Sequence, residues 1–162
     1  MLFRSGLGKR GIKSPHKLQG KGIIFISLQK LQGILTPDKK PAPRRRICAV
    51  DDSRMILNIY KSTLHELGFE PVLFEFPASA LEWLATEKPD MVLTDLNMPD
   101  ITGIDLAREI RRKYSAAELP VVMVTTQNEA SDNKAALEAG VNDILHKPFT
   151  AESLRAVIGK YL

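Results

Sequence analysis

With 162 residues, the chain has room for one ordinary domain and an appendage, and too few residues for two full hydrophobic cores. Hydrophobic residues make up 44% and charged residues 26% of the sequence, which is the ordinary composition of a soluble globular protein. No run of about 18 apolar residues exists, so the sequence predicts no transmembrane span. The single cysteine, Cys48, excludes an intramolecular disulfide, and nothing indicates an oxidising compartment, so we expect a cytoplasmic protein.

The net charge of +4 hides a strong segregation of charge along the chain. Residues 1–46 carry 12 Lys or Arg and one acid, a net charge of +11, whereas residues 47–162 carry 11 Lys or Arg and 18 acids, a net charge of −7. The first 43 residues are rich in Gly, Lys, Pro, Gln and Ser without a sustained period, which is typical of a linker. We therefore expect a basic, disordered extension (residues 1–45) and a folded domain (residues 46–162).

Three interpretations of the basic extension remain open. In the first interpretation, it is a disordered segment or the product of a start codon assigned too far upstream. Alternatively, it is an arm that contacts nucleic acid or an anionic membrane surface, or a cleaved targeting peptide, which its shortage of acids would suit. The extension lacks a helix–turn–helix pattern and aromatic stacking residues, so nucleic acid is not an expected partner.

From Ile47 onward, short apolar runs alternate with segments of helical period. In chain order, the predicted elements are a strand at Ile47–Val50, a helix up to Leu67, a strand at Val72–Phe76, a helix near Pro77–Thr86, a strand at Met91–Thr94, a helix near Ile104–Lys113, a strand at Val121–Val124, a helix near Ser131–Ala139, a strand at Asp143–His146 and a helix at Ala151–Leu162. The buried stripe predicted for the first helix consists of Ile56, Ile59, Tyr60, Thr63, Leu64 and Leu67. Gly68 follows this helix, where a left-handed cap is expected.

The middle strands predict the fold class. Residues 47–50 and 121–124 are apolar without alternation, which is typical of strands buried on both faces of a parallel sheet. Five strand–helix units in 116 residues predict one doubly wound α/β domain. Right-handed crossovers then place the carboxyl ends of all strands on one edge, where sheets of this kind form their sites.

Polar side chains follow four of the five predicted strands. Asp51 and Asp52 follow the first strand, Asp95 the third, Thr125 the fourth and Lys147 the fifth. Taken singly, these residues have ordinary explanations, such as helix capping for the first two acids and turns or solvated surface for the others. Their convergence on one edge has none, because three neighbouring acids repel one another unless a cation compensates them.

This set of residues suits phosphoryl transfer. Hard oxygen ligands with few protein donors favour Mg²⁺, with Mn²⁺ as a second candidate, and leave positions for phosphoryl oxygens. A carboxylate is a competent nucleophile toward a phosphoryl group. A cation and a lysine opposite each other would stabilise charge on the equatorial oxygens of the transition state.

The folded part of the chain resembles the receiver domain of two-component response regulators, and most closely the single-domain chemotaxis type. Four stretches in the right order carry the resemblance: ICAVDDS (47–53), MVLTDLNMPDITG (91–103), LPVVMVTTQ (119–127) and AGVNDILHKPF (139–149). The resemblance implies a flavodoxin-like (βα)5 fold, in which helices cover both faces of a five-stranded parallel sheet of order 2-1-3-4-5.

The resemblance also implies roles for the acidic residues. Asp95 matches the aspartate that is phosphorylated in the family. Asp52 matches the direct metal ligand and Asp51 the acid that holds the cation through water, while Asp95 and the backbone carbonyl of Asn97 complete the metal site. Gly103 closes the loop after Asp95, where the family commonly has glycine.

Further matches concern the phosphoryl group. Thr125 matches the hydroxyl that bonds a phosphoryl oxygen, and Lys147 matches the lysine that pairs with the phosphate. In this family the bond between the lysine and the following proline, here Lys147–Pro148, is cis. The side chains of Asn97 and Gln127 occupy positions that set the rate at which the acyl phosphate hydrolyses.

Two positions depart from the family pattern. The family often has Tyr or Phe three residues before the lysine, as a switch that reports phosphorylation, and here that switch position is Ile144. Beside Thr125 the family prefers a very small residue, and here Thr126 stands instead. Neither residue takes part in the phosphoryl chemistry, but both leave open whether the usual threonine–aromatic coupling relays the signal.

The resemblance implies a phosphorylation-activated response regulator rather than an enzyme, with at most self-phosphorylation from small donors and self-dephosphorylation. A sensor histidine kinase or histidine phosphotransfer protein would supply the phosphoryl group. A downstream target would bind the face of the fourth helix, fifth strand and fifth helix. The chain ends after the last predicted helix, so we expect output through protein contacts.

Other functions remain as alternatives. The domain would serve as a phosphorelay intermediate or phosphate sink, or as a receiver whose basic arm binds nucleic acid. An aspartate-nucleophile phosphatase is the weakest alternative, because those enzymes carry two acids spaced by one residue after the first strand, whereas Asp51 and Asp52 are adjacent.

Overall fold

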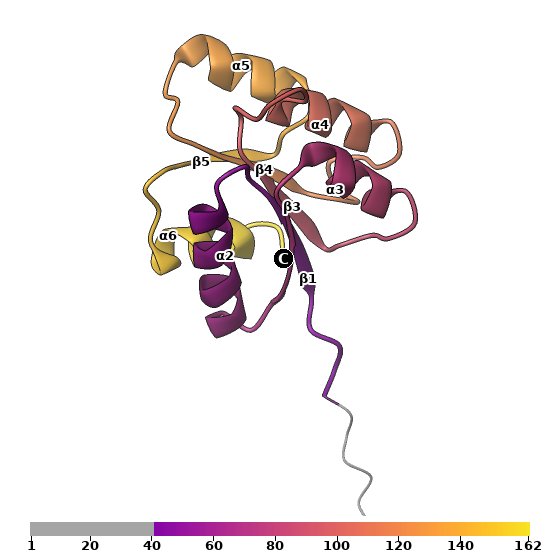
Figure 1. Ribbon diagram of the computed structural model, residues 1–162, viewed down its shortest axis with the longest axis vertical. Helices are drawn as coiled ribbons and strands as arrows, with labels where there is room; N and C mark the ends of the chain where they lie inside the picture. The colour runs from indigo at the N-terminus through magenta and orange to yellow at the C-terminus, as the bar shows by residue number, and fades with distance from the viewer. Residues whose placement is uncertain (1–40) are drawn as a thin grey trace, which may run out of the picture. The chain divides into compact units, whose positions relative to one another are not determined.

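A five-stranded parallel sheet forms the centre of the structure, a computed structural model that describes residues 41–162 (Figure 1). Its strands are β1 (Arg46–Val50), β2 (Glu70–Phe74), β3 (Met91–Thr94), β4 (Val121–Thr125) and β5 (Asp143–His146). They pair in the order β2-β1-β3-β4-β5, and each neighbouring pair is parallel. The predicted doubly wound α/β fold and its strand order are confirmed.

Helices cover both faces of this sheet. The helices of the described part are α2 (Arg54–Glu66), α3 (Pro77–Leu84), α4 (Gly103–Arg111), α5 (Ala130–Glu138) and α6 (Ala151–Gly159). α2 and α6 lie together on one side and α3, α4 and α5 on the other (Figure 1). Two apolar cores result, one on each face of the sheet.

The central strands contribute to both cores, as their unbroken apolar runs predicted. In β1, Ile47 and Ala49 lie in the core with α2 and α6, whereas Cys48 and Val50 lie in the core with α3, α4 and α5. This alternation arises because successive residues of a strand point to opposite faces. All four side chains are fully buried.

The buried face of α2 differs from the predicted stripe. Its buried residues are Leu57, Tyr60 and Leu64, whereas Ile59 is 40% exposed. Leu57 was not part of the predicted stripe, and Ile59 was. Both stripes are compatible with helical spacing and share Tyr60 and Leu64. Packing against the sheet and α6 selects the stripe at i, i+3 and i+7, so the prediction for Ile59 was wrong.

The strand β2 begins and ends two residues earlier than predicted, at Glu70 and Phe74 instead of Val72 and Phe76. It includes Pro71, which is tolerated because β2 is at the edge of the sheet. Phe76 lies outside the strand, as the N-cap residue of α3, and its side chain is 61% exposed. The last helix also ends before the predicted Leu162, at Gly159.

Helix α2 has defined ends that hold it against the site edge of the sheet. Ser53 is the N-cap residue, and its hydroxyl accepts the backbone N–H of Ile56 at 3.4 Å. At the other end, Gly68 has a φ of +91°, and the N–H of Phe69 donates to the carbonyl of Leu64 at 2.9 Å. The predicted left-handed glycine cap is confirmed.

Residues 1–40 of the predicted extension lie outside the described residues. Near the end of that extension, the guanidinium of Arg45 donates to the carbonyl of Leu162 at 2.5 Å, and its own carbonyl accepts the N–H of Glu70 at 2.9 Å. Within residues 41–162, no helix is long and apolar enough to span a bilayer.

Gly103, the first residue of α4, lies directly against the chain that follows β3. A Cβ at this position would overlap the carbonyl oxygen of Asp95 and lie 3.0 Å from its carbonyl carbon. The N–H of Gly103 donates to the carbonyl of Leu96 at 2.9 Å. The start of α4 therefore fits beside Asp95 only without a side chain at position 103.

We expect the Gly103→Ala substitution to lower the free energy of unfolding by about 3 kcal/mol, because the new methyl group meets backbone that cannot rotate away. Urea denaturation checks this value. The matched control is Gly159→Ala at the end of α6, where a Cβ would meet open space. This control should be neutral or stabilising by up to about 1 kcal/mol, and equal losses for both variants would contradict the argument.

Candidate functional site

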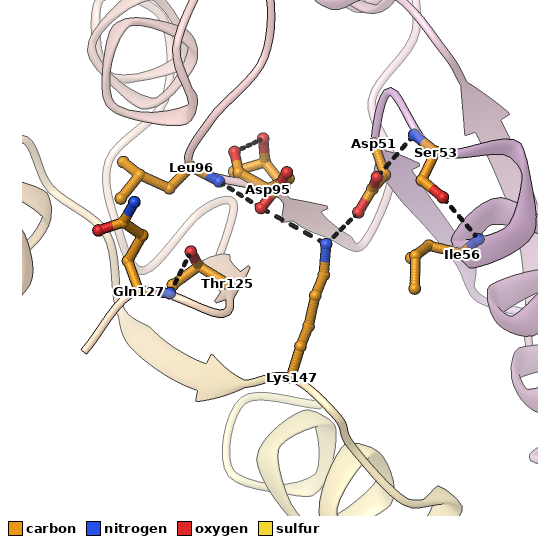
Figure 2. A network of polar contacts seen from close by, with 9 residues as sticks. Asp51, Ser53, Ile56, Asp95, Leu96, Thr125, Gln127 and Lys147 are labelled. Atoms are coloured by element: carbon orange, nitrogen blue, oxygen red, sulfur yellow. Dashed lines mark hydrogen bonds and ion pairs between the residues drawn. The ribbon is translucent and has the colours of Figure 1, made fainter.

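The carboxyl edge of the sheet brings together side chains from β1, β3, β4 and β5 (Figure 2). The ammonium of Lys147 donates to Oδ2 of Asp51 at 2.5 Å and lies 3.4 Å from Oδ1 of Asp95. The three side chains are largely buried, with exposed fractions of 11% for Lys147, 1% for Asp51 and 13% for Asp95. A single ammonium therefore links carboxylates from two neighbouring strands.

Both carboxylate oxygens of Asp51 are engaged. Oδ2 contacts Lys147, and Oδ1 accepts the backbone N–H of Ser53 at 2.9 Å. The N-cap residue of α2 is Ser53. Helix capping, the ordinary explanation for Asp51 and Asp52, is therefore mainly a role of this serine. The adjacent Asp52 is exposed to solvent.

Asp95 is fixed by its own backbone and by its neighbours. Its Oδ1 accepts the N–H of Leu96 at 2.9 Å, and its backbone carbonyl accepts the hydroxyl of Thr94 at 3.0 Å. Burial raises the pKa of Asp95 above its ordinary value of 3.8; Lys147 lowers it, the charge of Asp51 raises it, and the Leu96 N–H lowers it. Burial and the neighbouring carboxylate together outweigh the stabilising contacts.

Thr125 and Gln127 line the end of β4. The side chain of Thr125 is buried, and its hydroxyl accepts the backbone N–H of Gln127 at 3.1 Å. The carbonyl of Thr125 accepts the backbone N–H of Lys147 at 2.9 Å. The loops that carry the threonine and the lysine are therefore joined directly.

The remaining predicted positions surround this group. Asn97 is exposed in the loop after β3, and Thr126 is exposed after β4. Ile144, at the position where the family often has an aromatic residue, is half-buried against the core of α3, α4 and α5. The Lys147–Pro148 peptide bond is cis, as the resemblance implied.

Three carboxylates offer ligands for a cation. Asp51, Asp52 and Asp95 each present one oxygen, and these oxygens all lie within 4.8 Å of one another. Hard anionic oxygens suit Mg²⁺, which keeps several of its waters. The three carboxylates together therefore form a donor set that fits a divalent cation.

Some contacts of the site carry no clear signal in the sequence. The N–H groups of Ser53 and Leu96 are backbone groups, so side-chain chemistry could not point to them. Thr94 had a usable signal, because a hydroxyl in an apolar strand needs a hydrogen-bond partner when it is buried. Tyr60 was assigned only to the apolar face of α2, although a buried phenol also needs a partner.

The raised pKa of Asp95 leads to a pH-dependent prediction. Because the folded-state pKa lies above 3.8, ionisation of Asp95 costs stability as the pH rises from about 3.8 through the folded value. The Asp95→Asn substitution removes this cost. The substitution should therefore raise the free energy of unfolding at pH 7, and this increase should become smaller as the pH falls toward 3.8. Urea denaturation in the presence of a chelator measures both values.

The matched control is Glu82→Gln, which neutralises an exposed acid on α3. It should change the free energy of unfolding by less than about 0.5 kcal/mol across the same pH range. A pH-independent gain in the Asp95 variant would show that the effect does not come from its ionisation.

Comparisons with known proteins agree with this fold. The family model of the response regulator receiver domain matches residues 47–159. The chemotaxis protein CheY1 of Helicobacter pylori is 38% identical over 112 residues, which cover 68% of this chain and 90% of that protein.

Two further comparisons involve sensor proteins. The aerobic respiration control sensor protein ArcB of Escherichia coli is 30% identical over 150 residues, covering 88% of this chain, which spans only 19% of the length of ArcB. The receiver domain of the sensor histidine kinase PA1611 of Pseudomonas aeruginosa, solved with a magnesium ion coordinated in its active site cleft, matches with a TM-score of 0.67 and 25% identity over 73% of this chain and 97% of that one. The chain therefore belongs to the response regulator receiver family, whose members are the phospho-acceptor domains of two-component signalling.

Proposed function

We propose that Asp95 is the residue of this receiver domain that accepts the phosphoryl group. The main support is the placement of one ammonium, that of Lys147, between the carboxylates of Asp51 and Asp95 at the carboxyl edge of the sheet. A third carboxylate, that of Asp52, lies beside them and is open to solvent. Such a site offers a nucleophile, a fixed cation and ligands for a second cation.

The chemical step is a transfer to a carboxylate oxygen. Oδ1 of Asp95 is held by the N–H of Leu96 and faces Lys147, so we assign the attack on phosphorus to Oδ2. The new O–P bond forms as the P–N bond of a phosphohistidine breaks, and the imidazole nitrogen of the donor keeps the electron pair. Lys147 is placed to neutralise charge on the transferred oxygens.

A divalent cation belongs to the same proposal. Asp52, Asp95 and the backbone carbonyl of Asn97 would hold Mg²⁺ directly, and Asp51 would hold it through water; Mn²⁺ would suit the same oxygens. When bound, the cation supplies positive charge to the phosphoryl oxygens. The protein residues contribute its position and its charge balance.

Phosphorylation adds a charge near −2 to Asp95, and hydrogen-bond donors of the site would bind the new phosphoryl oxygens. The hydroxyl of Thr125 turns to a phosphoryl oxygen, and Lys147 pairs with another. Because the N–H of Lys147 is bonded to the carbonyl of Thr125, the two loops would move together and shift the equilibrium of the adjoining α5 face. With Ile144 at the usual aromatic position, this relay would not use a threonine–aromatic switch.

The same proposal implies the binding partners of the domain and the residues that set the lifetime of the phosphorylated state. A sensor histidine kinase or histidine phosphotransfer protein in the cytoplasm would donate the phosphoryl group. A target protein would bind the face of α5, β5 and α6, where Leu137 and His146 are exposed. Asn97 and Gln127 would set the rate of self-dephosphorylation, and small acyl phosphates would serve as alternative donors.

Labelling with acetyl phosphate and Mg²⁺ tests the assignment of Asp95. Intact-mass measurement should show one added phosphoryl group on the wild-type chain, and none when a chelator removes the metal. The Asp95→Asn substitution should abolish the label, because it removes the carboxylate that is proposed to attack phosphorus.

Two further variants test the neighbouring residues. Asp52→Ala should weaken Mg²⁺ binding, and Lys147→Ala should impair signalling more than uptake of the phosphoryl group.

The matched control is Asp100→Asn, which removes an exposed carboxylate from the same loop and retains a residue type that tolerates its φ of +68°. This variant should be labelled like the wild type. Label that persists in the Asp95 variant would mean that another residue is the nucleophile.

A further inference from the structure

The side chain of Tyr60 is an exception among the buried residues of this domain. It is fully buried in α2, and within the described residues its hydroxyl is the one buried side-chain oxygen or nitrogen without a hydrogen-bond partner. A buried phenol normally has a partner, because an unmade hydrogen bond costs the desolvation of the group. The missing hydrogen bond of Tyr60 is therefore best explained by a partner that the hydroxyl reaches in another state of the protein.

Tyr60 lies on the helix that follows Asp51 and Asp52, and its ring packs on a residue close to Lys147. Helical side chains point back toward the N-terminus of the helix, and α2 starts immediately after Asp51, Asp52 and Ser53. The Tyr60 ring also stacks on Phe149, with ring centroids 5.3 Å apart and planes inclined by 16°. Phe149 lies two residues after Lys147, so the tyrosine ring packs against the segment that follows the lysine.

The carboxylates of the site act on this hydroxyl. Burial raises the pKa of Tyr60 well above its ordinary value, and the negative charges of Asp51 and Asp95 raise it further. The Tyr60 hydroxyl therefore keeps its proton at all ordinary pH values and remains a hydrogen-bond donor.

The proposed phosphorylation creates a need for such a donor. Before phosphorylation, Oδ2 of Asp51 is bonded to Lys147, and its side chain is 1% exposed. If Lys147 moves to the phosphoryl group, Oδ2 loses its ammonium partner while it stays buried. A buried carboxylate that loses a partner is costly unless another donor replaces it.

We infer that Tyr60 is a positioning residue of this site, whose hydroxyl donates to Asp51 when Lys147 leaves that carboxylate for the phosphoryl group on Asp95. The inference rests on the proposed function. Tyr60 touches neither the phosphoryl group nor the donor and acts through Asp51. It stabilises the phosphorylated state because its hydrogen bond is made only there.

The Tyr60→Phe variant tests this inference with beryllium trifluoride, a tetrahedral mimic of the phosphoryl group that a carboxylate oxygen binds reversibly, in the presence of Mg²⁺. Fluorine NMR titration should give a dissociation constant about tenfold higher than that of the wild type, since a hydrogen bond to a charged group is lost. Without ligand, the unfolding midpoint should be unchanged or higher, because only an unpartnered hydroxyl is removed. In the wild type, a slowly exchanging tyrosine hydroxyl proton should appear when the mimic binds, and it should be missing in the variant.

The matched control is Tyr161→Phe, which removes the same atom from a tyrosine whose hydroxyl donates to the carbonyl of Asn142 and to Asp143. It should lower the unfolding midpoint and leave the affinity for the mimic unchanged. Equal affinities of the wild type and the Tyr60 variant would overturn the inference, whatever their midpoints. Failure of the wild type to bind the mimic would overturn the proposed function as well, which distinguishes the two failures.

Discussion

The ion pairs of Lys147 with Asp51 and Asp95 are the interaction on which the site depends. Two carboxylates with exposed fractions of 1% and 13% lie close together, and the negative charge of Asp51 raises the pKa of Asp95. One ammonium between them makes this arrangement tolerable. Buried ion pairs contribute little to net stability, because desolvation offsets their attraction. The charge cluster is therefore better explained by the chemistry that it supports than by the stability of the fold.

The sheet order makes this contact geometrically possible. Asp51 and Asp95 follow the neighbouring strands β1 and β3, but Lys147 follows β5, on the far side of β4. The long side chain of Lys147 reaches from the end of β5 past β4, the strand that ends in Thr125, to both carboxylates. Because all five strands are parallel, the same edge also receives the N-termini of the helices, whose N–H groups favour negative charge.

The site is connected to the two apolar cores in different ways. On the face of α3, α4 and α5, the neighbouring residue is the half-buried Ile144, an aliphatic side chain without a polar group. On the face of α2 and α6, it is the stacked pair of Tyr60 and Phe149. The stacked aromatic pair thus lies in the core of α2 and α6, whereas the position three residues before Lys147 is aliphatic.

The sequence alone determined the fold class, the strand order through the family resemblance, and the set of polar residues at the strand ends, because apolar runs and turn residues are local signals. It also predicted the glycine cap at Gly68 and the cis Lys147–Pro148 bond. Local signals did not reveal that α2 buries Leu57 instead of Ile59, that Lys147 bonds to Asp51, or that the Tyr60 hydroxyl has no partner. Only the tertiary structure decided these points, because each depends on which distant side chains meet after the sheet has formed and its helices have packed on it.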